Sequence, residues 1–354
     1  MQTLGKLKLI TERAKQDNKL KFTSLAHLIN EESLAACYRE LKRDKACGID
    51  GVTVEEYGRN LESNLKNLVS RMKTRTYQPK PARRVYIPKP GKEEKRPLGI
   101  SSVEDKLVQL MLKKILEAIY EPQFLDCSNG FRPKRNCHTA VEQLDKVVMT
   151  KPINYIVEVD IKKFFDSVRH YWLLRCVEER VSDPNFLWLI RKSLKAGIVE
   201  EGQWKESPTG TPQGSIASPT LANIYLHYVL DIWFKVKFKP KARGYVQLIR
   251  YCDDCAPRGC TGDEGRPLEA GLQEQASNHL KLHWLRAIVV SVKEKARQRL
   301  CQVSIKEARK GDPLLTCRKR SNDVKTGWES LTQDKSKSNL FTAWMASGMK
   351  VART

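Results

Sequence analysis

The sequence predicts an α+β fold, because long segments with helical spacing of apolar residues are separated by short strand-like runs. Helical spacing runs through residues 22–45, 54–74 and 103–115. Residues 154–159 and 245–251 have the apolar and aromatic content of strands. With 354 residues, 40% of them hydrophobic, the chain can bury a substantial core.

The N-terminal part predicts helices followed by a basic hairpin. The helical pattern of residues 22–45 ends in a basic cluster, and Gly48 to Gly51 then breaks it. A further helix is expected from Val54 to Thr74. The segment from Tyr77 to Gly99 is rich in proline and in basic residues, and Pro90-Gly91 is typical of a turn. An extended hairpin is therefore expected there.

Two more helices are indicated by their first residues. Ser102 suits the N-cap of a helix whose buried face begins at Val103. Ser218-Pro219 opens another helix, with proline at the first helical position.

The strands are expected to deliver three aspartates. The strand from Asn154 to Val159 ends at Asp160, and the strand from Tyr245 to Tyr251 runs into Asp253 and Asp254. Mg²⁺ prefers oxygen ligands and is bound by a few carboxylates together with substrate phosphates. Paired Mg²⁺ ions can activate a 3'-hydroxyl and hold a leaving pyrophosphate. An Asp-Asp turn by itself is more often a solvated loop. Whether these aspartates form a metal site therefore depends on the residues around them.

The charge and the cysteines narrow the class of protein. The formal net charge of +23 makes a polyanion the natural partner, with nucleic acid as the first candidate and a merely basic protein as the alternative. The ten cysteines do not form paired C-x-x-C motifs at zinc spacing, which indicates reduced thiols. The N-terminal sequence has no apolar run of signal-peptide or membrane-span length, so a soluble, cytoplasmic protein with no membrane partner is expected.

Seven short motifs, which include the three aspartates and several of the basic residues, follow one another along the chain: Gly48–Thr53, Tyr86–Lys89, Arg96–Ile100, Asn129–Pro133, Asp160–Asp166, Thr211–Ser215 and Tyr251–Asp254. Their content and order resemble the motifs of the reverse transcriptases, and most closely those of the group II intron-encoded reverse transcriptases and maturases. The resemblance covers about two-thirds of the chain, residues 22–255.

The resemblance implies a right-hand polymerase fold. Residues 1–150 would form an N-terminal extension and the fingers, and residues 151–255 would form the palm with the catalytic aspartates. The implied activity is RNA-directed DNA polymerisation, in which a primer 3'-hydroxyl attacks the nucleotide's alpha-phosphate with the help of two Mg²⁺ ions. The implied partners are an RNA template, a DNA primer, dNTPs and a group II intron RNA whose splicing the protein would assist.

The resemblance also assigns roles to single residues. Asp160, Asp253 and Asp254 would be catalytic and, together with Ile161, would hold the metal ions. Four residues would contact the incoming nucleotide: Lys89, Arg96, Phe165 and Gln213. Three arginines would contact the template or another RNA: Arg83, Arg84 and Arg132.

Each assignment has a structural alternative that the sequence leaves open. Lys89 and Arg96 could lie in a solvated charged loop. Phe165 could be a core residue, although Phe164 is the better core candidate. Gln213 could belong to an ordinary turn, and Arg132 to a purely structural loop.

The resemblance weakens after Asp254. In the family, an apolar strand follows the Asp-Asp turn, whereas here Pro257 removes a ladder donor and Gly259 weakens a strand. Later palm motifs and recognisable thumb, maturase or HNH endonuclease segments are missing from the sequence of residues 256–354. We therefore expect a basic tail with an incomplete or divergent fold. Our hypothesis is a change of reading frame near Asp254, and a divergent or truncated genuine region is the alternative.

Two competing functions remain at this point. One is an inactive RNA-binding remnant that keeps the basic fingers and lacks catalysis. The other is a different reverse transcriptase, such as a retron or diversity-generating enzyme. The oligomeric state and the identity of the partner RNA are left open.

Overall fold

The computed structural model describes residues 2–88, 93, 95–151, 155–161, 164–242, 244–255, 258–259 and 285–291. In residues 2–4, 155–160, 254–255, 258–259 and 285–291 only the backbone is described. The chain folds as two compact units, each made from separate stretches of sequence: Met1–Phe124 with Lys163–Tyr228, and Leu125–Lys162 with Val229–Thr354. This division differs from the three consecutive domains expected from the sequence, and the assignment of fingers and palm stays a prediction.

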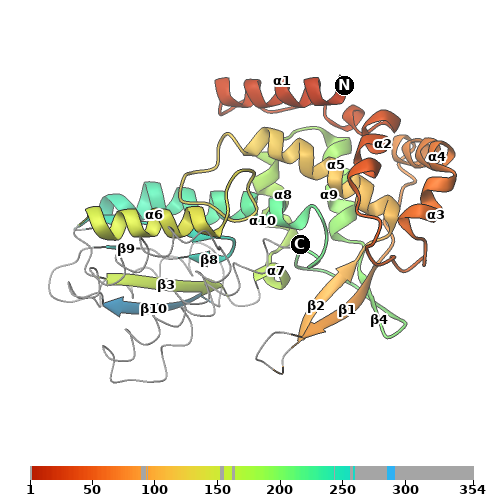
Figure 1. Ribbon diagram of the computed structural model, residues 1–354. Coiled ribbons are helices and arrows are strands. Elements are labelled where there is room, and N and C mark those ends of the chain that lie inside the picture. The colour runs from red at the N-terminus through yellow and green to blue at the C-terminus, as the bar shows by residue number, and fades with distance from the viewer. Residues whose placement is uncertain are drawn as a thin grey trace, which may run out of the picture. The chain divides into compact units, whose positions relative to one another are not determined.

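The first unit is mainly helical (Figure 1). It is centred on α5 (Val103–Tyr120), of whose 18 residues 12 are buried. Ser102 caps this helix as expected, because its hydroxyl accepts a hydrogen bond from the amide of Asp105 at 3.2 Å. Four helices pack directly against α5: α1 (Gln2–Gln16), α2 (Glu31–Glu40), α9 (Pro184–Leu194) and α10 (Ser218–Leu226). A fifth, α8 (His170–Glu178), packs on α9 and α10.

The single helix expected from Val54 to Thr74 is two helices, α3 (Val54–Arg59) and α4 (Leu61–Lys73). The break falls at Asn60, whose backbone is not helical. Gly58, just before it, is poor at extending a helix, and a side chain there would overlap the hydroxyl of Tyr38. Close packing against Tyr38 therefore accounts for the glycine two residues before the break.

The hairpin expected between Tyr77 and Gly99 is present in the first unit. Strands β1 (Ala82–Pro88) and β2 (Lys95–Ile100) pair antiparallel, from Arg83 opposite Ile100 to Pro88 opposite Lys95. The tip at Pro90-Gly91 lies outside the described residues. Two short strands complete this sheet, in the order β2-β1-β4-β5: β4 (Ile198–Glu200) and β5 (Gln203–Lys205).

The second unit contains a sheet centred on β3 (Tyr155–Ile161) and covered by α6 (Cys137–Thr150) (Figure 1). Apolar residues of α6 pack on Ile249 and Tyr251 and form the core of this unit. The other described strands of the sheet are β6 (Val246–Gln247), β7 (Arg250–Tyr251), β8 (Asp254–Cys255), β9 (Arg258–Gly259) and β10 (Leu285–Ser291). Short helical segments precede β6: η2 (His227–Asp231), η3 (Phe234–Phe238) and η4 (Lys239–Lys241).

The return strand after Asp254 is present, but only in two short pieces. β8 pairs with both β3 and β7, and β9 pairs with β3 and β6. Ala256 and Pro257 lie between these pieces, outside the described residues. The return strand that Pro257 and Gly259 were expected to weaken is therefore present, and it is short on both sides of the proline.

The C-terminal segment contributes one further strand to the described structure. β10 pairs antiparallel with β3 along its whole length, from Leu285 opposite Ile161 to Ser291 opposite Tyr155. The sequence had assigned no strand there. Within the described part of the chain, no helix is both long and apolar enough to cross a membrane.

Candidate active site

The Asp-Asp segment forms a tight hairpin turn in the second unit. Arg250 lies opposite Cys255 and Tyr251 lies opposite Asp254, which leaves Cys252 and Asp253 as the two turn residues. Cys252 has a left-handed backbone with φ of +57°, which is uncommon for a residue other than glycine. The side chains of Tyr251 and Cys252 are buried against α6, whereas that of Asp253 is half-buried. The turn is thus held from one side by the core.

The strand register brings the third aspartate to the same end of the sheet. Val159 of β3 lies opposite Cys255 of β8, so the next step of this antiparallel ladder brings the backbone of Asp160 opposite that of Asp254. Ile161, the last residue of β3, has a buried side chain. Among the residues whose side chains are described, no group of three His, Cys, Asp or Glu could hold a metal ion, and Asp160 and Asp254 are outside that set.

The Asn129–Pro133 stretch lies directly against this hairpin. The amide of Asn129 donates to the carbonyl of Arg250 at 2.9 Å, and the amide of Arg250 donates to the carbonyl of Cys127 at 2.7 Å. A side chain on Gly130 would overlap the backbone nitrogen and the sulfur of Cys252. The glycine is needed because two backbone segments approach each other closely there.

Arg132, expected to contact the template, is buried, with 7% of its surface exposed. Its Nη1 donates to the carbonyls of Leu125 at 2.9 Å and Ser128 at 2.8 Å. The guanidinium therefore braces the loop beneath the hairpin. This placement fits the structural alternative and weakens the prediction that Arg132 meets a phosphate.

Burial raises the pKa of two ionisable groups at the hairpin above values that are already alkaline. It raises the pKa of the Tyr251 hydroxyl to about 12, with the nearby Cys252 thiol adding to the effect. It also raises the pKa of the Cys127 thiol to about 12, with the Asp231 carboxylate as the second cause. Neither group therefore contributes a negative charge near pH 7.

Phe165 belongs to the first unit, on the short helix α7 (Phe164–Ser167). Its ring is half-buried and meets the ring of Phe164 edge-on, with centroids 5.4 Å apart. Phe164 is 2% exposed and is the core member of the pair, as expected. The carbonyl of Phe165 accepts a hydrogen bond from the amide of Thr211 at 2.7 Å, which joins α7 to the segment that carries Gln213.

The turn that carries Gln213 is also tied to the β1–β2 hairpin. The carbonyl of Gln213 accepts a hydrogen bond from the amide of Gly99 at 2.5 Å. Gly214 has a φ of +107°, and a side chain there would overlap the carbonyl of Gly99. Arg96 is exposed on the same strand as Gly99, whereas Lys89 lies outside the described residues. Three of the four nucleotide-contact candidates thus belong to connected segments of one unit.

The two neighbouring arginines of β1 cannot serve one ligand together. Successive side chains on a strand point to opposite faces, so Arg83 and Arg84 diverge. Both are half-buried, and Nη2 of Arg83 donates to the carbonyl of Cys47 at 2.9 Å. The Nε of Arg83 is buried without a hydrogen-bond partner.

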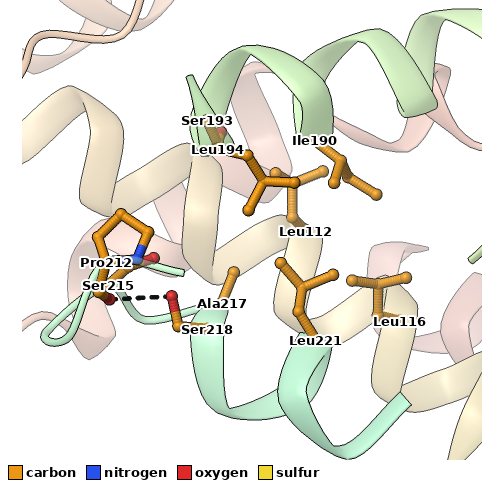
Figure 2. A pocket seen from close by; sticks show the side chains of 10 residues that line it. All are labelled: Leu112, Leu116, Ile190, Ser193, Leu194, Pro212, Ser215, Ala217, Ser218 and Leu221. Carbon is orange, nitrogen blue, oxygen red and sulfur yellow. Dashed lines mark hydrogen bonds between the residues drawn. The ribbon is translucent and has the colours of Figure 1, made fainter. Parts of the chain in front are cut away.

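A shallow apolar crevice lies under the Gln213 turn and is closed by leucine and isoleucine side chains of α5, α9 and α10 (Figure 2). Ser218 closes one end of it by donating from its hydroxyl to the carbonyl of Pro212 at 3.0 Å. The space inside, about 10 Å³, is the room that a single water molecule needs. The crevice is a packing gap beneath the turn and is too small for a nucleotide.

Two polar residues important for the hairpin had no role in the sequence interpretation. Arg250 and Asp231 form an ion pair at 2.8 Å, and both side chains are fully buried. The sequence could have indicated a buried ion pair, because a charged residue within an apolar strand or helix needs a buried partner. The pairing itself depends on which segments meet.

The sequence matches known proteins over more than half of its length. The family model "Reverse transcriptase (RNA-dependent DNA polymerase)" matches residues 87–303, so the match continues well beyond Asp254, where the recognisable motifs end. The chain is 37% identical to the group II intron-encoded protein LtrA of Lactococcus lactis over 238 residues, which are 67% of this chain and 39% of LtrA.

Other relatives share shorter regions. Protein YkfC of Escherichia coli is 36% identical over 222 residues, which are 60% of this chain and 58% of that protein. Nuclear intron maturase 1 of Arabidopsis thaliana is 32% identical over 94 residues, 26% of this chain and 13% of the maturase. The chain therefore spans less than two thirds of the length of these relatives.

Proposed function

Because this chain belongs to the reverse transcriptase family, with relatives among the group II intron-encoded proteins, we propose that it is an RNA-directed DNA polymerase of the group II intron type. The observation that carries the proposal is the strand register in the second unit. It brings the backbone of Asp160 opposite that of Asp254 and next to the turn with Asp253. Mg²⁺ binds oxygen ligands, and carboxylates that come from neighbouring strand ends can supply them.

The proposed reaction is attack of a primer 3'-hydroxyl on the alpha-phosphate of a dNTP. Asp160, Asp253 and Asp254 would hold two Mg²⁺ ions, with Ile161 beside them as a further candidate ligand. When bound, these ions would favour the alkoxide of the primer and neutralise charge on the phosphates.

The other residues would bind and orient the nucleotide. Arg96, together with Lys89, would pair with the triphosphate through charge-assisted hydrogen bonds. The half-buried ring of Phe165 would lie under the sugar and exclude a 2'-hydroxyl. Gln213 would hydrogen-bond the template or the nucleotide, and its connection to Gly99 supports this role because the turn is fixed relative to β2.

The proposed partners are an RNA template, a DNA primer and a group II intron RNA. The net charge of +23 supports binding to a nucleic acid backbone. The relatives named as a group II intron-encoded protein and an intron maturase support an intron RNA in particular. Help in splicing that RNA is part of the proposal.

A second candidate function is an inactive RNA-binding remnant. It is favoured by Pro257, which separates the two short pieces of the return strand beside the aspartates. Such a protein would bind RNA through its basic surface, with an affinity that falls steeply as salt rises.

Primer extension on an RNA template with dNTPs and Mg²⁺ separates the two functions. The polymerase proposal requires extension by the wild-type chain and its loss in Asp253→Ala. Asp44→Ala, which changes an exposed turn residue, is the matched control and should extend normally. Salt-sensitive RNA binding without any extension would overturn the polymerase and leave the remnant.

A further inference from the structure

The guanidinium of Arg250 lies at the base of the aspartate-bearing hairpin with no exposure to solvent. Its Nε and Nη2 donate to the two carboxylate oxygens of Asp231 at 2.9 and 2.8 Å. Nη2 also donates to the hydroxyl of Ser128 at 2.7 Å, and Nη1 donates to the carbonyl of Cys252 at 2.7 Å. All four residues belong to the second unit.

The bond to Cys252 acts on the turn itself. Cys252 has the left-handed backbone, and its peptide carbonyl leads directly into Asp253. An L-residue in this backbone region is strained, and the strain persists only where the surroundings hold the backbone in place. A charge-assisted hydrogen bond to that carbonyl fixes the orientation of the peptide plane between Cys252 and Asp253, and thereby the position of Asp253.

Asp231 fixes the orientation of the Arg250 guanidinium and neutralises its charge. A two-point pairing between a guanidinium and a carboxylate fixes the plane of the guanidinium. Without that carboxylate, an unpaired cation would be buried three and four residues before two aspartates proposed as metal ligands. It would then be drawn towards those carboxylates and would compete with a divalent ion.

We propose that Arg250 is a positioning residue for the proposed metal site, and that Asp231 holds it in that position. The pair sets the conformation of the Cys252-Asp253 turn, so that the carboxylates are arranged for the ions before they bind. This inference rests on the polymerase function proposed above. It adds two residues that do not touch the substrate.

Two variants separate positioning from mere stability. Arg250→Lys keeps the charge and loses the two-point pairing. Replacing a buried ion pair by apolar residues often leaves stability intact, so Arg250→Met combined with Asp231→Leu should keep the fold while losing the bond to Cys252. Urea unfolding identifies the conditions in which each variant is folded, and Arg180→Lys is the control.

Arg180 is a suitable control because it is also a buried arginine, 1% exposed, whose guanidinium donates to backbone carbonyls. Its partners, the carbonyls of Leu20 at 2.8 Å and Asp17 at 2.9 Å, belong to the first unit. Its replacement should affect stability without affecting metal binding.

The direct readout is Mn²⁺ binding to the full chain, followed by electron paramagnetic resonance, with Mg²⁺ titration of primer extension beside it. Disturbed outer contacts of a metal site commonly weaken binding tenfold or more, so both Arg250 variants should show a loss of about that size. Arg180→Lys should bind Mn²⁺ as the wild type does. Asp253→Asn should lose the site.

The outcomes distinguish this inference from the proposed function. A folded double variant whose Mn²⁺ and Mg²⁺ dependence equals that of the wild type would overturn the positioning role alone. Mn²⁺ binding that depends on Arg250 in a chain that extends no primer would overturn the polymerase alone. Mn²⁺ binding that is indifferent to Asp253→Asn would overturn both.

Discussion

The amide of Gly99 donates a 2.5 Å hydrogen bond to the carbonyl of Gln213, and this bond joins two sequence motifs more than a hundred residues apart. Both residues belong to the first unit. The bond fixes the Gln213 turn to the strand that carries Arg96. Substitution of Gly214, the next residue after Gln213, tests this connection.

Gly214→Ala should destabilise the protein by about 2 to 4 kcal/mol, because it adds backbone strain at φ of +107° and an overlap with the Gly99 carbonyl. Gly202→Ala is the matched control, since Gly202 also has a positive φ but open space around it. Urea unfolding should show a clearly smaller loss for the control. Equal losses would mean that the contact with Gly99 adds nothing.

Gly130→Ala should disturb the aspartate-bearing hairpin, because the added methyl group would overlap the backbone of Cys252. We expect a loss of about 1 to 3 kcal/mol in the free energy of unfolding, together with weaker Mn²⁺ binding. Gly5→Ala, an exposed change within α1 with open space around it, should instead stabilise by up to about 1 kcal/mol. Unchanged Mn²⁺ binding in a folded Gly130→Ala protein would contradict the prediction.

Phe165→Val should increase incorporation of rNTPs relative to dNTPs, because the proposed barrier to the 2'-hydroxyl becomes smaller. The measurement is the ratio of kcat/KM for the two nucleotides in primer extension. Phe164→Ala provides the contrast: it removes a ring that is 2% exposed and should cost about 3 to 5 kcal/mol of stability without changing this ratio. A ratio that changes only in Phe164→Ala would reverse the two roles.

Arg96 and Arg132 should differ in how they affect RNA binding. Arg96 is exposed, so Arg96→Ala should weaken binding and reduce the salt slope by about one unit if it pairs with a phosphate. Arg132→Ala should instead destabilise the fold by about 1 to 3 kcal/mol, because the carbonyls of Leu125 and Ser128 lose a donor. Filter binding at several salt concentrations and urea unfolding test the pair. A reduced salt slope in a stable Arg132→Ala protein would restore its predicted role with RNA.

His170 should make stability fall at mildly acidic pH. Burial lowers the pKa of its imidazole below the ordinary 6.5, and Nε2 lies 2.7 Å from the carbonyl of Gly210. Since the unfolded state then binds the proton more readily, stability is full above about pH 6.5 and falls as the pH drops through that value towards the lowered pKa. Urea unfolding at several pH values should show this decline, and His170→Gln should flatten it. An unchanged pH profile in the variant would assign the decline to other groups.

Much of the local structure was predictable because it depends on short-range pattern. The Ser102 cap, the basic hairpin of β1 and β2, and strand β3 with Asp160 near its end each follow from spacing or turn chemistry within a few residues. The break at Asn60 was not predicted, and the close approach of Tyr38 to Gly58 beside it depends on packing between helices. The same holds for β10, whose partner strand is over a hundred residues away.

The order of the motifs and the candidate aspartates, and with them the family, could be read from residue type and spacing alone. The use of the polar residues around the aspartates became visible only once the chain was folded. Arg132 braces a loop, and Arg250 pairs with Asp231 beneath the aspartate turn. The physical reason is that the burial of a charged side chain and the identity of its partner depend on which distant segments pack together.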